Sequence, residues 1–202
     1  MDMNFDHLWS ANVGKMKKSI IRELLKLTQK PEIISFAGGL PDPKLFPFQD
    51  IQECMNAVLE KDGGKALQYG TTEGDNRLRA QLVKRYNEKE GLNITENNLL
   101  ITTSSQQGLD FCGRVFVDPG DVVFCELPSY LGGLNAFSAS GAELCGIEMD
   151  ENGMSHIKLD EAIQKTIEAG KTPKFIYVVP DFQNPAGMTM GEQRRREILQ
   201  VA

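Results

Sequence analysis

Residues 174–187 read KFIYVVPDFQNPAG, and this stretch says more about the fold than any other. An apolar run from Phe175 to Val179 ends in a turn that presents Asn184 directly before Pro185. Proline biases the residue before it towards extended backbone. Open α/β sheets bind ligands at the carboxyl ends of their parallel strands. An amide side chain here is therefore a candidate donor to a phenolate or a carboxylate.

Similar apolar runs occur earlier in the chain and alternate with helical patterns. The predicted strands are 99–104, 121–127, 142–149 and 174–180, and the predicted helices are about 105–117, 130–139, 157–169 and 191–202. Near-continuous apolar strands that alternate with helices are typical of βαβ units, with helices on both faces of a parallel sheet. The sequence therefore predicts an α/β fold of three layers, α/β/α, with a mostly parallel sheet.

The first hundred residues lack this alternation of apolar strands and helices. An amphipathic helix is predicted over 15–29, an irregular Gly- and Pro-rich segment over 34–47, a helix over 50–60 and a loop over 61–74. Asp75 can cap a further helix to about Glu90, burying Leu78, Leu82 and Val83, with Gly91 as its stop. A composition break near residue 50 predicts two parts. Residues 1–49 would form an N-terminal arm and small-domain portion, and 50–202 the first half of a large domain.

Composition and charge narrow the classes of function. The net charge of −6 and the pI near 5.1 argue against nucleic acid as the main partner, because phosphate backbones need a basic face. The sequence has neither a signal-peptide core nor an apolar run of membrane-spanning length, so a cytoplasmic protein without membrane contact is expected. We expect the four cysteines to be small buried hydrophobes in a reducing compartment. Because His7 and His156 are far apart, no metal site is predicted.

The segment ITTSSQQGL, residues 101–109, is the first candidate site. A predicted strand ends there and a helix opens at Ser104, Ser105 and Gln106. Free N–H groups of the first helical turn, together with the helix dipole, form a seat for a phosphate. The alternative is that Ser104 or Ser105 is simply an N-cap.

Two more candidates lie at the same predicted sheet edge. Tyr130, in ELPSYLGG (126–133), can stack on a flat ligand, although a core or surface tyrosine is the simpler interpretation. Asn184 can likewise be only a turn residue. The three loops together would offer a phosphate seat, an aromatic plane and an amide donor. A planar phosphorylated heterocycle with a phenolic oxygen satisfies all three.

The chain resembles the N-terminal half of a fold-type I pyridoxal-phosphate aminotransferase. The resemblance is to the branch with 2-aminoadipate and kynurenine-type aminotransferases and the aminotransferase-like domains of MocR-type regulators. The matching stretches are MKKSIIRELLKLTQKPEIISFAGGLPDPKLFP, ALQYGTTEGDNRLRAQL, ITTSSQQGLD, DPGDVVFCELPSYLG and VVPDFQNPAGMTM.

The resemblance implies roles for individual residues. Ser105 and Gln106 would hold the phosphate of pyridoxal 5'-phosphate, and Tyr130 would stack on its ring. Asn184 would bind the phenolic oxygen and help to seat the substrate carboxylate. Tyr69 would reach the cofactor of the neighbouring subunit in a homodimer, and the substrate pocket would be lined by Gly38 and Gly39. The implied reaction moves an amino group between an amino acid and a 2-oxo acid.

Some parts of the family pattern differ or are missing. The family usually has Asn at Asp181 and Thr at Ala186, two positions that carry no chemistry. In this family the Schiff-base lysine lies beyond residue 202, and neither Lys171 nor Lys174 matches it. No catalytic residue is therefore assigned.

The missing residues lead to an expectation about the chain as a whole. We expect a fragment of a longer aminotransferase, inactive alone, whose incomplete sheet leaves apolar edges exposed. The alternatives are a piece of the effector-sensing domain of a MocR-type regulator, or a non-catalytic module that kept the fold.

Overall fold

The computed structural model describes residues 5–10, 13, 33 and 41–202. The chain divides into two compact units, one of residues 18–101 and one of residues 102–202 with 1–17. The boundary between the units falls at residues 101 and 102, and the predicted domain division at residues 49 and 50 stays a prediction. The predicted helix 15–29, and Gly38 and Gly39 in the predicted irregular segment, lie outside the described residues.

The unit of residues 18–101 is helical where it is described. Its elements are the short 3-10 helices η2 (Pro43–Leu45) and η3 (Glu96–Asn98) and the α-helices α3 (Phe48–Ala66) and α4 (Asn76–Glu90). The predicted cap of α4 is confirmed, because the Asp75 carboxylate accepts from the N–H groups of Arg77 and Leu78. The predicted stop is also confirmed, since Gly91 has a left-handed backbone with φ 65°.

Two sequence predictions in this unit are wrong. Helix α3 continues to Ala66 through the predicted start of the loop, with a single non-helical residue at Asp62. A glycine inside a helix costs only about 1 kcal/mol, so Gly63 and Gly64 do not end it. In α4, Leu78 is exposed while Arg79 is buried, because the Arg79 guanidinium donates to the carbonyl oxygens of Leu99 and Glu96.

The other unit contains the sheet. After the 3-10 helix η1 (Asp6–Leu8), its elements are α5 (Ser104–Phe116), β1 (Val122–Leu127), α6 (Leu131–Ala139), β2 (Glu143–Asp150), β3 (Gly153–Met154), α7 (His156–Glu168), β4 (Pro173–Tyr177) and α8 (Glu192–Val201). The strand order is β3-β2-β1-β4. Strand β1 pairs in parallel with β2 and β4, whereas the short β3, which the sequence did not predict, is antiparallel to β2.

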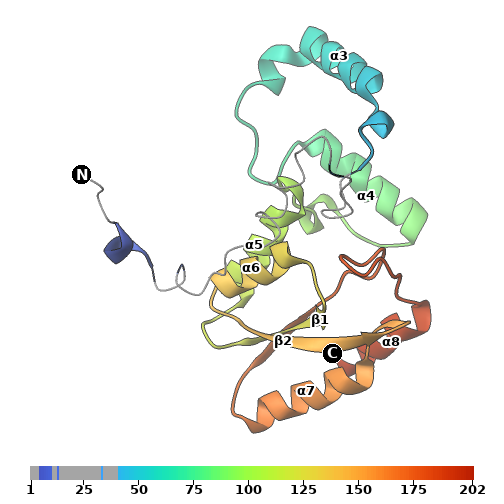
Figure 1. The fold of residues 1–202 in the computed structure, drawn as a ribbon. Helices are drawn as coiled ribbons and strands as arrows, with labels where there is room; N and C mark the ends of the chain where they lie inside the picture. Colours follow the sequence, from blue (N-terminus) through green and yellow to red (C-terminus); the bar gives the residue numbers. More distant parts are fainter. Residues whose placement is uncertain (1–4, 11–12, 14–32, 34–40) are drawn as a thin grey trace. The chain divides into compact units, whose positions relative to one another are not determined.

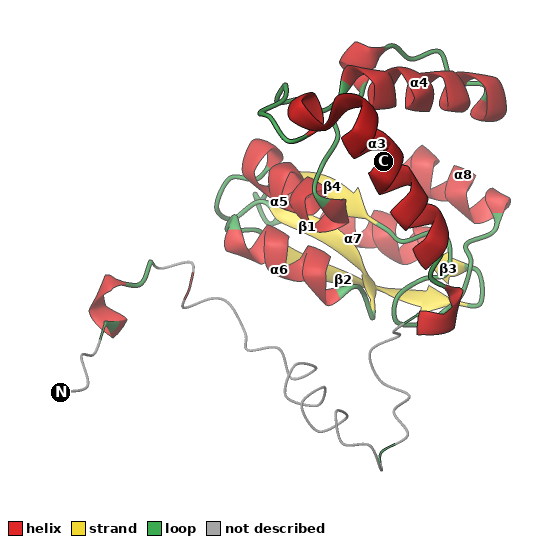
Figure 2. Ribbon diagram, turned by 90° about the horizontal axis from the view of Figure 1, so that it is seen from above, coloured by secondary structure: helices red, strands yellow, loops and turns green. Residues whose placement is uncertain are grey.

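Helices cover both faces of this sheet (Figures 1 and 2). Helices α5 and α6 lie on one face, and α7 and α8 lie on the other. The predicted three-layer α/β/α arrangement with a mostly parallel sheet is thereby confirmed. The predicted strand 99–104 is wrong in this structure, since the backbone N–H of Ile101 donates to the Glu73 carbonyl at 3.0 Å and α5 already begins at Ser104.

Strand β1 contributes to a core on each face. Val122 and Phe124 pack with Ile147, Leu159 and Ile198 under α7 and α8. Between them, Val123 points to the other face and packs with Phe137 of α6. Burying a side chain of this size stabilises the fold by about 1.5–3 kcal/mol. The alternation fixes the register of β1, because a shift by one residue would exchange the two cores.

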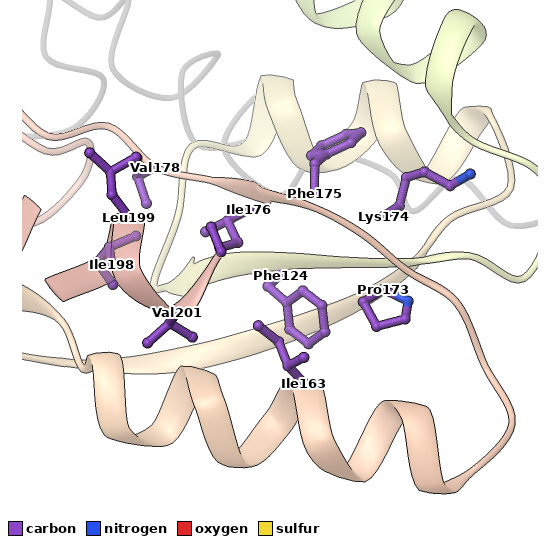
Figure 3. A pocket seen from close by; sticks show the side chains of 11 residues that line it. Phe124, Ile163, Pro173, Lys174, Phe175, Ile176, Val178, Ile198, Leu199 and Val201 are labelled. Carbon is purple, nitrogen blue, oxygen red and sulfur yellow. The ribbon is translucent and has the colours of Figure 1, made fainter. Parts of the chain in front are cut away.

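Beside β4, at the edge of the four-stranded sheet, apolar side chains line a pocket (Figure 3). Its walls come from β1, α7, β4 and α8, and the lining includes Phe124, Ile163, Ile176, Val178, Ile198 and Val201. In the part of the chain that the structure describes, every helix is too short or too polar to cross a membrane.

The predicted burial of all four cysteines is only partly right. Cys125 is buried in β1 and Cys145 is half-buried, but Cys54 and Cys112 are exposed. Both lie on helices that bury few side chains, since α3 has no buried residue and α5 buries only Gly113. Burial raises the pKa of the Cys125 thiol to about 11, which keeps it protonated.

Candidate functional site

The N-terminus of α5 is open to solvent. Thr103 is the residue before the helix, and its side chain does not cap the first turn, while Gln107 Oε1 accepts from the Thr103 N–H at 2.6 Å. The alternative in which Ser104 or Ser105 serves as the N-cap is therefore not observed. Ser105 and Gln106 are exposed, and Ser104 has a positive φ of 63°, which is uncommon for a residue with a side chain. The unpaired N–H groups and the positive end of the helix dipole make this turn a seat for an anion.

A hydrogen bond connects the first turn of α5 to the start of α6. The side-chain amide of Gln106 donates to the Gly132 carbonyl at 3.0 Å. Gly132 has no room for a side chain, because a Cβ atom there would lie 2.5 Å from both Gln106 Oε1 and Tyr130 Cζ. The side chain of Gln106 and the ring of Tyr130 therefore both lie against Gly132. Two of the predicted site residues are brought together.

A second tyrosine, Tyr177, which the sequence analysis did not single out, packs against α6. Tyr177 ends β4, and its ring packs edge-on against Phe137 with centroids 5.3 Å apart. A Cβ atom on Gly133 would lie 2.8 Å from Tyr177 Cε1, so α6 approaches the strand closely at this point. Burial, and after it the nearby Tyr130 and Glu126, raises the pKa of the Tyr177 phenol. Tyr177 therefore stays protonated.

The loop that carries Asn184 is held by hydrogen bonds between its own main-chain groups. The main-chain N–H of Gln183 donates to the Met188 carbonyl at 2.7 Å, and the Gly187 N–H donates to the Gln183 carbonyl at 2.5 Å. The peptide bond between Asn184 and Pro185 is cis. Asn184 is exposed, and its side chain makes no hydrogen bond within the described residues. Its amide is thus available to a ligand.

The same loop is tied to the residues before Tyr130. The side-chain amide of Gln183 donates to the Pro128 carbonyl at 2.9 Å. Between Pro128 and Tyr130, Ser129 is buried, and its hydroxyl has no hydrogen-bond partner among the residues described here. The loops after β1 and β4 therefore meet at the carboxyl end of the sheet.

The remaining predicted site residues lie elsewhere. Tyr69 belongs to the unit of residues 18–101, and its side chain is fully exposed. Gly38 and Gly39 lie outside the described residues. Lys171 and Lys174 pair with Glu143 at 2.5 Å and with Asp121 at 2.8 Å, near the amino end of β4 and away from the Asn184 loop. No role was assigned to either lysine, and the roles of Tyr69 and the two glycines stay predictions.

Sequence reasoning missed the buried polar residues under the site. Glu126 and Gln183 are each only 2% exposed, and Gln183 Nε2 lies 3.2 Å from Glu126 Oε2. The sequence offered only a weak signal, because Glu126 interrupts the apolar run VVFCEL (122–127) whereas Gln183 lies in the turn after KFIYVVP. Asp181, treated as a neutral departure, pairs with Arg195 at 2.6 Å, and this bond lowers the pKa of its carboxyl group.

The comparison with protein families decides the classification. The model of the family described as aminotransferase class I and II matches residues 37–202. The chain belongs to this family. It is 43% identical over 200 residues to aromatic-amino-acid aminotransferase 1 of Thermococcus litoralis, which covers 99% of this chain and 48% of that relative.

Solved structures agree with the family assignment. A kynurenine aminotransferase of Pyrococcus horikoshii, solved in complex with PMP, is 42% identical, with a TM-score of 0.88 over 98% of this chain and 48% of that one. An alpha-aminoadipate aminotransferase of Thermus thermophilus, complexed with N-(5'-phosphopyridoxyl)-L-leucine, is 37% identical, with a TM-score of 0.82 over 98% and 47%. The chain spans about half the length of these relatives.

Proposed function

We propose that the protein is an aminotransferase that uses pyridoxal 5'-phosphate and moves an amino group between an amino acid and a 2-oxo acid. The observation that carries the proposal is the contact of Gln106 with Gly132, which brings an uncapped helix start beside the Tyr130 ring. Family membership adds support, as does the phosphopyridoxyl compound named in the structure of a relative.

The residues present fit a flat, phosphorylated ring. The first turn of α5 offers N–H groups that the Thr103 side chain does not cap, and the glycine at position 132 lets the Tyr130 ring and Gln106 lie together beside that turn. The buried Ser129 hydroxyl has no partner among the described residues and directly precedes Tyr130. An anion at a helix N-terminus gains about 0.3–2 kcal/mol from the dipole.

Each residue has a distinct part in the proposed mechanism. The N–H groups of Ser105 and Gln106 would hold the phosphate, the Tyr130 ring would pack on the pyridine ring, and the Asn184 amide would donate to the phenolic oxygen and to the substrate carboxylate. Pyridoxal 5'-phosphate, when bound, supplies an electron sink for the bonds at the substrate α-carbon. Tyr69 reaches the phosphate in the other subunit of a homodimer, Gly38 and Gly39 line the substrate pocket, and the protein is cytoplasmic.

Borohydride reduction in the presence of pyridoxal 5'-phosphate, followed by mass spectrometry, tests the proposal. The full-length protein that carries this chain should give a stoichiometric adduct at a single lysine and should transaminate an amino acid with a 2-oxo acid. Residues 1–202 alone should give no stoichiometric adduct at a unique lysine. A full-length protein that neither forms the adduct nor transaminates would exclude the proposed activity.

A further inference from the structure

A carboxyl group is buried without a cation directly under the proposed site. Glu126, the last residue but one of β1, has 2% of its surface exposed, and none of the lysines and arginines in the described ranges forms an ion pair with it. Its Oε2 atom accepts from the Val179 N–H at 3.0 Å and from Gln183 Nε2 at 3.2 Å. Burying a carboxyl group is costly unless its hydrogen bonds are made. Glu126 joins the end of β1 to the segment after β4.

Gln183 uses every polar atom that it has. Its Nε2 donates to Glu126 and to the Pro128 carbonyl, and its Oε1 accepts from the Ala186 N–H at 2.7 Å. Its main-chain N–H and carbonyl bind Met188 and Gly187 across the loop. One buried side chain therefore fixes the loop internally and also fixes it against the residues before Tyr130.

Asn184 depends on this arrangement. It follows Gln183 directly, it is exposed, and its own side chain forms no hydrogen bond with any described residue. The residue before Gln183, Phe182, has a positive φ of 49°, a backbone conformation that persists only where the surroundings enforce it. The hydrogen bonds of Gln183 hold the segment in this form, together with the bond from the Phe182 N–H to Thr189 Oγ1 at 3.2 Å and the bond from the Met190 N–H to the Pro180 carbonyl at 2.7 Å.

We propose that Glu126 and Gln183 are positioning residues that set the place of the Asn184 amide relative to the Tyr130 ring, and thereby the affinity for pyridoxal 5'-phosphate. This inference rests on the proposed function. Neither residue needs to touch the cofactor, because both act through Asn184. Burial raises the pKa of the Glu126 carboxyl group, and the hydrogen bonds that it accepts from Val179 and Gln183 act in the opposite direction.

A double-mutant cycle in the full-length protein tests the inference. Gln183→Met keeps the side-chain volume but removes the hydrogen bonds. It should raise the Kd for pyridoxal 5'-phosphate about tenfold, as expected when buried partners lose their bonds. In an Asn184→Ala background the same change should raise Kd by less than about twofold, because residues that act as one unit are not additive. Gln193→Met, at an exposed position on α8, is the matched control and should leave Kd unchanged.

Hydrogen exchange provides a second readout that needs no cofactor. In Gln183→Met the amides of Ala186 and Gly187 should exchange about tenfold faster, while those of β1 keep their protection. If Gln183→Met does not yield folded protein, Glu126→Gln replaces it, with the same direction and a smaller change. The inference would be overturned if amide exchange and Kd were unchanged in these variants. It would also be overturned if Gln183→Met raised Kd by the full tenfold in the Asn184→Ala background. Neither result would count against the proposed function. A wild type that does not bind the cofactor would overturn the proposed function.

Discussion

The side-chain amide of Gln106 donates a hydrogen bond to the Gly132 carbonyl at 3.0 Å, which joins the first turn of α5 to the first turn of α6. The two helices lie on the same face of the sheet, but the two partners are 26 positions apart in the chain. The bond thus places a helix start, where an anion binds well, beside an aromatic ring that can stack on a flat ligand.

Gly132→Ala tests the close packing of this pair. The new methyl group would lie 2.5 Å from Gln106 Oε1 and from Tyr130 Cζ, so both side chains must move. Overpacking of this kind costs about 1–3 kcal/mol. Because the displaced groups are the proposed cofactor ligands, the Kd for pyridoxal 5'-phosphate, measured by absorbance titration, should rise about tenfold. Gly64→Ala is the control, since nothing lies within 4 Å of a Cβ atom there.

Ser105→Asp separates the stability of α5 from its role in binding. A carboxylate in the first turn should stabilise the helix by about 0.3–1 kcal/mol through the dipole. The same charge repels a bound phosphate, so the Kd for pyridoxal 5'-phosphate should rise by about tenfold or more. Thermal unfolding and cofactor titration should therefore move in opposite directions. Ser105→Asn, which adds no charge, should retain most of the affinity; equal losses in both variants would contradict a phosphate at this turn.

Mixing two inactive variants tests the role of Tyr69 in a homodimer. Tyr69 is fully exposed and lies in a different unit from Asn184. If Tyr69 completes the site of the partner subunit, a hybrid of Tyr69→Phe and Asn184→Ala subunits has one site with both defects and one site with neither. Transaminase activity should then recover to about a quarter of the wild-type value after random reassortment. A mixture no more active than its parent variants would assign Tyr69 to its own subunit.

The buried Glu126 makes stability depend on pH. Its folded-state pKa lies above its ordinary value because the carboxyl group is buried. The folded state therefore binds more protons than the unfolded state, and stability falls as pH rises from about 4.3 through the raised pKa. Glu126→Gln lacks this loss, so its free energy of unfolding in urea, relative to the wild type, should increase over that window and then level off. A constant difference at all pH values would show that Glu126 has an ordinary pKa.

Much of the unit that contains the sheet could be predicted from the sequence, because the patterns that indicate its strands and helices are local. The apolar runs that became β1, β2 and β4 alternate with helical patterns, and the structure moves their predicted ends by only a few residues. The strand predicted at 99–104 failed for a different reason. A strand needs a neighbour to pair with, and no described strand runs beside Ile101, whose N–H binds Glu73 instead.

Of the candidate site, the sequence predicted residues near the surface but not the buried residues beneath them. Tyr130 and Asn184 follow β1 and β4, and Ser105 and Gln106 lie at a helix start, positions that the sequence pattern indicates. Glu126 and Gln183 were missed because a polar residue at a strand end is usually exposed. Their burial arises where the end of β1 meets the loop after β4, with the two residues 57 positions apart in the chain, which no local pattern indicates.

A structure of the full-length protein with pyridoxal 5'-phosphate bound tests the central claim most directly. The phosphate should lie at the first turn of α5, within hydrogen-bond distance of the N–H groups of Ser105 and Gln106, with the ring on Tyr130 and the Asn184 amide on the phenolic oxygen. A cofactor bound away from the start of α5, or stacked on a residue other than Tyr130 with Asn184 turned to solvent, would contradict it.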